Sequence, residues 1–492
     1  MGNVRKYYIQ LAIVLLSVVA FAAQTTVIPS TVSSSDVISQ FEKSAQEYAD
    51  LREKIEETLP PLPKKATAEE IEAHKIAFLK SVQAARKGAK HADIFTPDAA
   101  KQIRSIIADE FRGKDRADFR KRVLLAENKG VPIKVNVRYP ESKELLETPP
   151  NLLLALPKLP KQLNYRFVGN YLLLVDRENE LIVDYMSGAL PPATGTASTV
   201  KNDSPAISPD TTSGSAAAPA SVNTSVSVRL PSPLTLPLRE GSLRMAVFGD
   251  SGRGSKEQYE LGRLMETYHQ ADPFDVVLLV GDNIYGPDSP ADMKAKFEDA
   301  YRSLIDDGVK FYASLGNHDT PNQRFYAPFN MNGQDYYRTE KNGVSFYALN
   351  SNYLDKRQLD WLNSSLAADT NKWKIAFFHH PPFSSGGRHG SDVEVRKVLH
   401  PIFVQNGVDV VFTGHDHFYE RIKPQDGITY FVTGAAGKIR RGDIKDRSPL
   451  SAAAFDTDLS FMLIEIAGDE MYFQVLARDG KTVDSGVIQR RD

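Results

Sequence analysis

The chain has 492 residues, of which 41% are hydrophobic and 25% charged, and its formal net charge is −2 at pH 7. This size and apolar content allow two folded domains, each with its own hydrophobic core, and the near-neutral charge provides no global basic field that would indicate nucleic-acid binding. The sequence contains no cysteine, which excludes disulfides, thiolate metal sites and a lipid anchor on an N-terminal cysteine.

Residues 1–22 have the features of a cleaved signal peptide. A short basic segment over residues 1–8 precedes an apolar run from Leu11 to Ala23, and Ala20-Phe-Ala22 is a small-x-small cleavage sequence. The apolar run is shorter than the roughly 20 residues that a membrane-spanning helix needs. These features predict an exported bacterial protein, periplasmic or secreted, with no stable membrane span after signal cleavage, rather than an uncleaved anchor. The missing cysteines agree with an oxidising compartment.

Residues 30–190 are predicted to form an accessory α+β domain that is largely helical. A helical pattern covers residues 36–59 and stops at Pro60. Its apolar residues are spaced by heptads, which suits either packing within the domain or a partner-binding helix. A second helical block runs from Glu69 to about Leu125 and is interrupted around Pro97.

The end of this accessory region has strand patterns. Residues 163–168 and 171–175 read as a hairpin joined by Gly169-Asn170, and residues 180–184 as a third strand. No chemical motif accompanies these elements. Binding an envelope partner, chaperoning and covering an active site are all compatible with the accessory domain.

Residues 191–237 are dense in Ser, Ala, Thr, Pro and Gly and have few large apolar side chains. Such a segment cannot bury enough surface to offset the entropy of ordering its chain, so a flexible linker is predicted. The linker separates the accessory domain from a C-terminal domain at residues 238–492.

Five apolar runs in the C-terminal domain each end at a polar motif. The runs are residues 243–248, 274–280, 309–315, 375–378 and 408–413. Near-continuous apolar stretches are typical of strands buried on both faces, and amphipathic helical patterns lie between the first three. Alternating strands and helices predict βαβ units, in which functional side chains gather beyond the carboxyl ends of the strands.

The motifs at these ends contain seven candidate metal ligands, which are Asp250, Asp282, Tyr285, Asn317, His379, His415 and His417. Carboxylate, phenolate, amide and imidazole donors suit iron, zinc or manganese better than a metal that prefers thiolate. A single Gly-Asp pair is usually only a strand-to-loop turn. The occurrence of all five motifs together favours a metal centre.

The order and residue types of the motifs resemble the calcineurin-like metallophosphoesterases. The motifs are Gly249-Asp-Ser-Gly252, Gly281-Asp-Asn-Ile-Tyr285, Gly316-Asn-His-Asp319, Phe378-His-His-Pro-Pro382 and Gly414-His-Asp-His417. Most of that superfamily has Asp-x-His in the first motif, whereas here Gly252 stands at the histidine position and Tyr285 supplies a ligand from the second motif. This exchange is the mark of the purple acid phosphatase branch. The resemblance covers about residues 243–492.

The resemblance implies a metallophosphoesterase-type β-sandwich flanked by helices, built from βαβ units. It also implies a first metal, Fe(3+), bound by Asp250, Tyr285 and His417, a second metal, Fe(2+), Zn(2+) or Mn(2+), bound by Asn317, His379 and His415, and a bridging Asp282. The donor chemistry agrees, because anionic carboxylates and a phenolate neutralise a trivalent ion, while an amide and neutral imidazoles suit a divalent one.

The implied activity is the hydrolysis of phosphomonoesters by a metal-bound hydroxide, because two metal ions together lower the pKa of bound water and stabilise the oxygens of a phosphoryl displacement. His318 and His389 match family positions that contact the phosphate and protonate the leaving group. The expected partner is a small phosphorylated substrate. Two alternatives stay open: a phosphodiesterase or nucleotidase on the same metals, and an envelope-binding or scaffold protein with a vestigial phosphatase domain.

Several residues beside the motifs have two interpretations. Glu420 and Arg421 either form an ion pair that buttresses the last ligand loop or contact substrate. Arg253 and Arg388 are either solvated surface charges or contacts for a substrate's anionic groups. Asn283 either hydrogen-bonds the hydroxide or substrate, or only shapes its turn.

Overall fold

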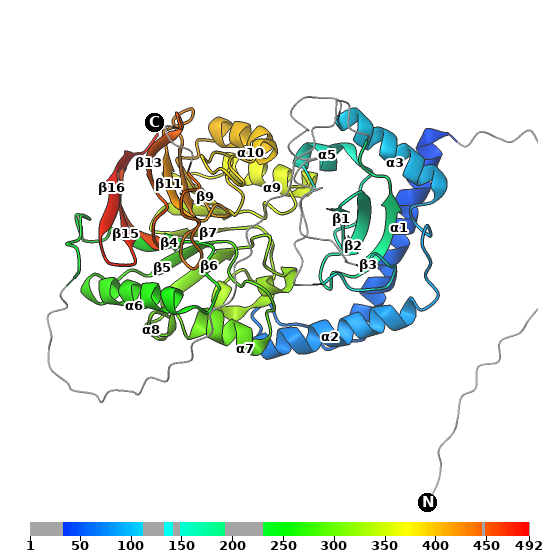
Figure 1. The fold of residues 1–492 in the computed structure, drawn as a ribbon, viewed down its shortest axis with the longest axis horizontal. Coiled ribbons are helices and arrows are strands. Elements are labelled where there is room, and N and C mark those ends of the chain that lie inside the picture. Colours follow the sequence, from blue (N-terminus) through cyan, green and yellow to red (C-terminus); the bar gives the residue numbers. More distant parts are fainter. Residues whose placement is uncertain (1–32, 112–131, 141–147, 192–229, 445–447, 492) are drawn as a thin grey trace, which may run out of the picture.

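The computed structural model describes residues 33–111, 132–140, 148–191, 230–444 and 448–491. The predicted signal peptide and most of the predicted linker lie outside these residues. Two bodies lie side by side, the accessory domain in blue and cyan and the C-terminal domain in green to red (Figure 1). In the described part of the chain, no helix is long and apolar enough to span a bilayer.

The helices of the accessory domain start where their sequence supplies a cap. They are α1 (Ser34–Glu56), α2 (Ala68–Ala85), α3 (Pro97–Glu110) and α5 (Pro150–Ala155). Ser33 and Thr96 cap α1 and α3 with their hydroxyl groups, and Thr67 and Glu70 form a reciprocal capping box on α2. The predicted helix over residues 36–59 is confirmed, as is the interruption before Pro97. Residues 112–125 of the predicted second block lie outside the described residues.

A three-stranded antiparallel sheet completes the accessory domain, in the order β1 (Leu163–Val168), β2 (Tyr171–Asp176), β3 (Ile182–Ser187). The hairpin and the third strand predicted from the sequence are confirmed. One face of the sheet packs on α1 and α3 through a core that includes Phe41 and Tyr165, whose stacked rings are 6.5 Å apart. The accessory domain therefore has a hydrophobic core of its own.

The C-terminal domain contains two sheets. The six-stranded sheet has the order β16-β15-β14-β4-β5-β6, with β4 (Leu243–Phe248), β5 (Val276–Val280), β6 (Lys310–Ser314), β14 (Ser460–Ala467), β15 (Glu470–Ala477) and β16 (Thr482–Gln489). The seven-stranded sheet has the order β13-β11-β12-β10-β9-β8-β7, with β7 (Tyr337–Lys341), β8 (Val344–Ala348), β9 (Trp373–Phe377), β10 (Val410–Thr413), β11 (Tyr419–Ile422), β12 (Thr429–Thr433) and β13 (Ser451–Phe455). Strands β4, β5 and β6 are parallel, as are β8, β9 and β10.

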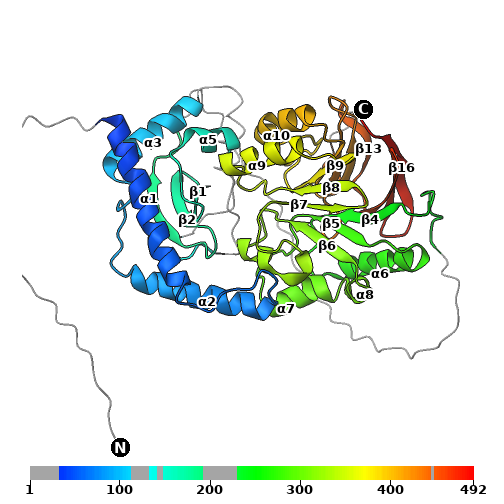
Figure 2. The same ribbon diagram turned by 180° about the vertical axis from the view of Figure 1, so that it is seen from behind.

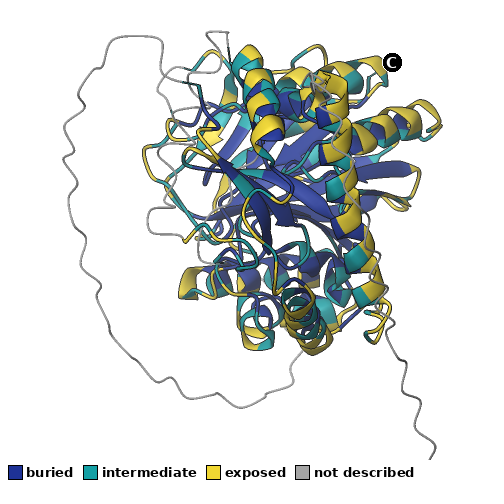
Figure 3. Ribbon diagram, turned by 90° about the vertical axis from the view of Figure 1, so that its right-hand side faces the viewer, coloured by how far each residue is buried: buried dark blue, intermediate teal, exposed yellow. Residues whose placement is uncertain are grey.

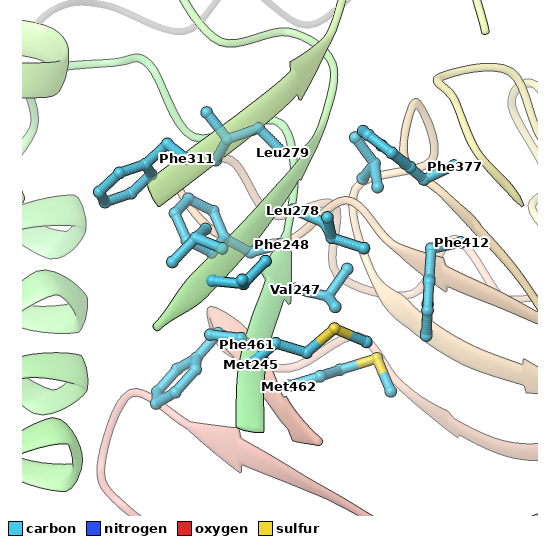
Figure 4. Close-up of a cluster of buried hydrophobic side chains, with 14 of the residues drawn as sticks. Met245, Val247, Phe248, Leu278, Leu279, Phe311, Phe377, Phe412, Phe461 and Met462 are labelled. Carbon is cyan, nitrogen blue, oxygen red and sulfur yellow. The ribbon is translucent and has the colours of Figure 1, made fainter. Parts of the chain in front are cut away.

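The two sheets pack face to face around a continuous apolar core. Val247 and Leu278 of one sheet point toward Phe377 and Phe412 of the other (Figure 4). Because side chains alternate along a strand, the neighbouring Phe248 lies on the opposite face, toward the helices (Figure 4). This double-sided burial explains why the strands are almost continuously apolar in sequence.

Helices cover the outer face of each sheet. Helix α6 (Lys256–Ala271), α7 (Pro290–Met293) and α8 (Arg302–Asp306) flank the six-stranded sheet, and α9 (Lys356–Ala367) and α10 (Val393–Gln405) flank the other. The strands lie buried in the centre while the helices turn exposed faces outward (Figure 3). The predicted β-sandwich flanked by helices is confirmed.

The two domains share an interface that is partly polar and partly apolar, because Ala66, Ala68 and Ile71 of the accessory domain also belong to the hydrophobic core of the C-terminal domain. Helix α2 extends to α7 (Figure 2), where Lys75 Nζ lies 2.9 Å from Asp288 Oδ1. Arg166 Nη1 of β1 donates to the carbonyl of Asn352 at 2.9 Å, and Asn322 Nδ2 donates to the carbonyl of Glu178 at 2.7 Å. The accessory domain therefore contacts the C-terminal domain directly.

Candidate metal centre

The predicted ligands lie in five loops at the carboxyl ends of strands from both sheets. Asp250 and Asp282 follow β4 and β5, and Asn317 follows β6. His379 and His415 follow β9 and β10 of the other sheet. Because the sheets pack face to face, the two sets of loops meet at one edge of the sandwich.

The first group of donor atoms comes from Asp250, Tyr285 and His417. The Tyr285 hydroxyl donates to Asp250 Oδ1 at 3.1 Å and lies 3.3 Å from His417 Nε2. His417 Nε2 is 3.4 Å from the same Asp250 oxygen. Metal–ligand bonds of about 2.0–2.2 Å place neighbouring ligand atoms at separations of this size.

The second group comes from Asn317, His379 and His415. Asn317 Oδ1 lies 2.9 Å from His379 Nε2 and 3.1 Å from His415 Nδ1, and the two ring nitrogens are 3.2 Å apart. His379 Nδ1 is 3.1 Å from the carbonyl of Val280. A hydrogen bond to that carbonyl puts the proton on Nδ1 and leaves the Nε2 lone pair for a metal.

Asp282 connects the two groups. Its carboxylate, the carboxylate of Asp250 and the imidazole of His417 form a cluster whose ligand atoms are all within 4.8 Å of one another. Its Oδ1 is also 3.4 Å from His379 Nε2 of the second group. A carboxylate in this place can reach two ions, so the arrangement fits a dinuclear centre.

The protonation states of these buried side chains also favour the binding of metal cations. Burial raises the pKa of Tyr285 well above its ordinary value, and the charges of Asp250 and Asp282 raise it further, so the phenol ionises only if a cation stabilises it. Burial lowers the pKa of His379 and, with the surrounding histidines, that of His415. Their imidazoles are therefore neutral, the form that binds metals.

Three of the ligand residues have left-handed backbone conformations. The φ angles are 56° at Asp250, 51° at Asp282 and 70° at His415. Residues other than glycine seldom adopt this region, and the strain costs of order 1–3 kcal/mol each. The surrounding fold holds these residues in conformations that aim their side chains at one point.

Gly252 is enclosed by the loop that carries Tyr285. A Cβ atom at Gly252 would lie 1.8 Å from the carbonyl oxygen of Asn283 and 2.6 Å from Ile284 Cα. No side chain fits there unless the backbone of this loop moves. The loop that carries Tyr285 thus fills the space that a side chain at position 252 would need. For this reason the glycine of the first motif and the tyrosine of the second motif occur together.

Comparisons with known proteins agree with this geometry. Residues 243–419 match the calcineurin-like phosphoesterase family. The C-terminal domain carries the calcineurin-like metallophosphoesterase fold. Purple acid phosphatase 17 of Arabidopsis thaliana is 29% identical over 247 residues, which cover 42% of this chain and 71% of that protein. Tartrate-resistant acid phosphatase type 5 of Oryctolagus cuniculus is 25% identical over 311 residues, or 52% of this chain and 95% of that protein.

Among solved structures, a purple acid phosphatase from yellow lupin (Lupinus luteus) seeds is similar in fold. It is 18% identical, with a TM-score of 0.46, and the match covers 52% of this chain and 55% of that chain. The metallophosphoesterase domain has purple acid phosphatase homologues among the proteins similar in sequence.

The two predicted catalytic histidines each lie beside a different group of candidate ligands. The His318 ring is 4.9 Å from that of Tyr285, and its backbone N–H donates to Asp282 Oδ1 at 3.0 Å. The His389 ring is 4.2 Å from that of His415. Burial lowers the pKa of His389 to about 2, and Arg440 and Arg388 add to this effect.

Asp319 was missed in the sequence, although it belongs to one of the motifs. Its carboxylate accepts hydrogen bonds from the N–H of Gly316 at 2.8 Å, the N–H of Ile284 at 2.9 Å, and both the backbone and side-chain nitrogens of Asn283 at 3.0 and 2.9 Å. It therefore fastens the loop of Asp282 and Tyr285 to the loop of Asn317. Asn283, which also donates to the carbonyl of Ser314 at 2.8 Å, shapes its turn.

Carboxylates behind the last ligand loop hold the loop of His389. Glu420 accepts from the backbone N–H of Ser385 at 2.9 Å. Asp416 accepts from the Ser384 hydroxyl at 2.5 Å and from the N–H of Gly390 at 3.1 Å. Both residues hold this loop from within the fold, and Glu420 does so through hydrogen bonds to Ser385 and Ser451 rather than through an ion pair with Arg421.

Arg421 also buttresses the fold. Its Nε donates to Asp484 Oδ2 of β16 at 2.8 Å, and its guanidinium lies 5.4 Å from the centre of the Phe473 ring. It thereby ties β11, which follows His417, to the six-stranded sheet. The contacts of Arg421 with Asp484 and Phe473 explain its position, and no substrate contact is needed to do so.

Proposed function

We propose that the protein hydrolyses phosphomonoesters with Fe(3+) held by Asp250, Tyr285 and His417, and Fe(2+), Zn(2+) or Mn(2+) held by Asn317, His379 and His415. The observation that supports it most directly is the place of Asp282, whose carboxylate lies within reach of both donor groups. The carboxylates of Asp250 and Asp282 and a Tyr285 phenolate are anionic donors, while the amide and imidazoles of the second group are neutral, so the two groups suit ions of different charge.

When bound, a pair of ions of this kind lowers the pKa of water and neutralises charge on the phosphate oxygens. The residues of the chain then orient the substrate. His318, beside Tyr285, and His389, beside His415, lie on two sides of the centre, where each can hydrogen-bond a phosphate oxygen. With its pKa of about 2, a neutral His389 can donate one such bond through its N–H group.

A vestigial domain is the less favoured alternative. Loss of activity in such a domain would leave at least one ligand position replaced or turned away. All seven candidate ligands are instead present, and their donor atoms converge in two groups. A phosphodiesterase or nucleotidase on the same metals stays a second candidate, which a substrate panel can separate from a monoesterase.

The test is a panel assay on protein whose metal content has been measured. p-Nitrophenyl phosphate, its bis-ester and nucleotides are compared for the wild type and Asp282→Asn, with Asp360→Asn as a control, because Asp360 is exposed and pairs with Lys356 on its own helix. We expect monoester hydrolysis, two metal equivalents, and loss of both in Asp282→Asn. Two metal equivalents and near-normal turnover in Asp282→Asn would refute the site assignment.

A further inference from the structure

A pocket lies between the sheet of the accessory domain and the loop that carries Asn317 and His318. Its walls come from both domains, with Asn164 and Arg166 of β1 on one side and Asn317, His318 and Asn352 on the other. Because Asn317 is a candidate metal ligand and His318 a candidate catalytic residue, the pocket adjoins the metal centre. The accessory domain therefore supplies part of the wall beside the site.

The alternation of side chains along β1 explains why polar groups line this wall. Leu163, Tyr165 and Phe167 belong to the hydrophobic core of the accessory domain. Asn164 and Arg166 therefore lie on the opposite face of the strand. This face presents hydrogen-bonding side chains to the C-terminal domain, where buried polar groups need partners.

Two amide side chains of the pocket have unused hydrogen-bonding atoms. Asn164 is only 6% exposed, and in the part of the chain that the structure describes its side chain has no hydrogen-bond partner. On the opposite wall, Asn352 Nδ2 donates to the carbonyls of Leu315 and Gly316 at 3.2 and 3.0 Å, while its buried Oδ1 has no partner among the described residues. A buried polar group without a partner costs free energy, which a polar ligand would recover.

The chemistry of the lining favours hydroxyl groups. Asp176 and Arg177 also line the pocket, but both have ionic partners, since Arg52 Nε lies 3.1 Å from Asp176 Oδ2 and Arg177 pairs with Asp335. The amides are thus the groups left to receive a ligand. An amide side chain both donates and accepts hydrogen bonds, as a hydroxyl group does, whereas a carboxylate or phosphate only accepts.

The size of the pocket limits the ligand to a compact group. Its volume is about 60 Å³, which is room for on the order of four water molecules at about 15 Å³ each. A small alcohol with several hydroxyl groups is of this size, and a nucleoside is much larger.

We propose that this pocket receives the alcohol part of the substrate, so that the preferred substrates are phosphomonoesters of small polyols such as glycerol. The inference rests on the proposed function, because the phosphoryl group would occupy the metal centre. Water adds to the phosphorus, the bond from phosphorus to the ester oxygen breaks, and the polyol leaves with that oxygen and one proton from the water. Asn164 determines specificity by holding the hydroxyl groups of the polyol, and it takes no part in the proton transfer.

The kinetic test compares glycerol 3-phosphate with propyl phosphate, which has the same carbon skeleton but no free hydroxyl groups. We expect the wild type to have a kcat/KM at least about tenfold higher on glycerol 3-phosphate, because a site built to bond hydroxyl groups rejects an analogue that lacks them. Asn164→Ala should lower kcat/KM on glycerol 3-phosphate about tenfold and change that on propyl phosphate by less than about twofold.

Two further variants control for effects on packing. Asn164→Leu keeps about the size of the side chain without its hydrogen bonds, and it should lower the ratio of glycerol 3-phosphate to propyl phosphate as Asn164→Ala does. Asn363→Ala is the matched control, because Asn363 is an exposed asparagine on α9, and it should leave the ratio unchanged.

A binding measurement separates this inference from the proposed function. 3,4-Dihydroxybutylphosphonate, in which a phosphorus–carbon bond replaces the ester bond, and butylphosphonate are titrated calorimetrically into the metal-loaded protein. We expect the dihydroxy compound to bind at least about tenfold more tightly to the wild type, and this difference to disappear in Asn164→Ala. Equal affinities in the wild type, or equal losses on both esters in the two Asn164 variants, would overturn the polyol pocket while leaving a phosphatase. Selective binding of the dihydroxy compound without hydrolysis of any ester would support the pocket and overturn the proposed function.

Discussion

Asp319→Asn should weaken the metal centre although Asp319 is not one of the predicted ligands. The carboxylate accepts four N–H groups, three of them through Oδ2 and one, from Ile284, through Oδ1. An asparagine that keeps its oxygen in the Oδ2 position turns an NH2 group toward the N–H of Ile284. One hydrogen bond is lost, two donors face each other, and the other three bonds lose their ionic partner.

The magnitude follows from these bonds. An unsatisfied buried donor costs about 1–3 kcal/mol, so with the weaker remaining bonds we expect Asp319→Asn to lower the free energy of unfolding by about 2–4 kcal/mol. Asp319→Ala would remove all four bonds, about 6–12 kcal/mol if they were additive, which approaches the whole stability of a domain, about 5–15 kcal/mol. The asparagine variant is therefore the informative one.

The assay combines urea unfolding, metal content by mass spectrometry, and kcat/KM on p-nitrophenyl phosphate. Changes behind metal ligands typically cost 10–100-fold in metal affinity or activity, and we expect a loss of that size. Asp360→Asn, an exposed helix position paired with Lys356, is the control and should change none of the three. The result that would refute this reasoning is an Asp319→Asn variant with two metal equivalents, a turnover within twofold of the wild type and an unchanged urea midpoint. The hydrogen bonds of Asp319 would then not be what holds the two loops together.

Three further predictions follow from the same structure. Tyr285→Phe should abolish the visible absorption of the iron-loaded protein, because only a phenolate transfers charge to ferric iron; a persisting band would show that another residue is the ligand. Gly252→Ala should lower metal occupancy, measured by mass spectrometry, because its Cβ would lie 1.8 Å from a carbonyl oxygen of the Tyr285 loop. Burial opposes ionisation of Glu178, but Arg324 and Arg52 outweigh it and lower its pKa below 4.5, so its stabilisation is present above pH 4.5 and lost as the pH falls through the lowered value. Glu178→Gln should cost about 3 kcal/mol at neutral pH and little at low pH, and equal losses in urea melts at both would contradict this assignment.

Local sequence determined the elements and the ligand types. Strands such as β4 and β5 were predictable because burial on both faces demands continuous apolar runs, and helices such as α3 because Thr96 and Pro97 mark a start that depends only on neighbouring residues. The candidate ligands could be recognised because carboxylate, phenolate, amide and imidazole groups recur at strand ends, where a sandwich of this kind must place its loops.

Only the tertiary structure decided which groups support the centre. Asp319 bonds residues 35 and 36 positions away, and Glu420 holds a loop 35 positions away, so the motifs contain these residues but do not show what they hold. The sequence likewise left open whether Arg253 is a surface charge or a substrate contact. Its place beside the Tyr285 ring, which it shares with Lys438, is visible only in the tertiary structure because Lys438 is distant in sequence. The order of apolar residues along the chain predicts which side chains are buried, but hydrogen bonds and charges act between atoms that only the packing of two sheets and an accessory domain brings together.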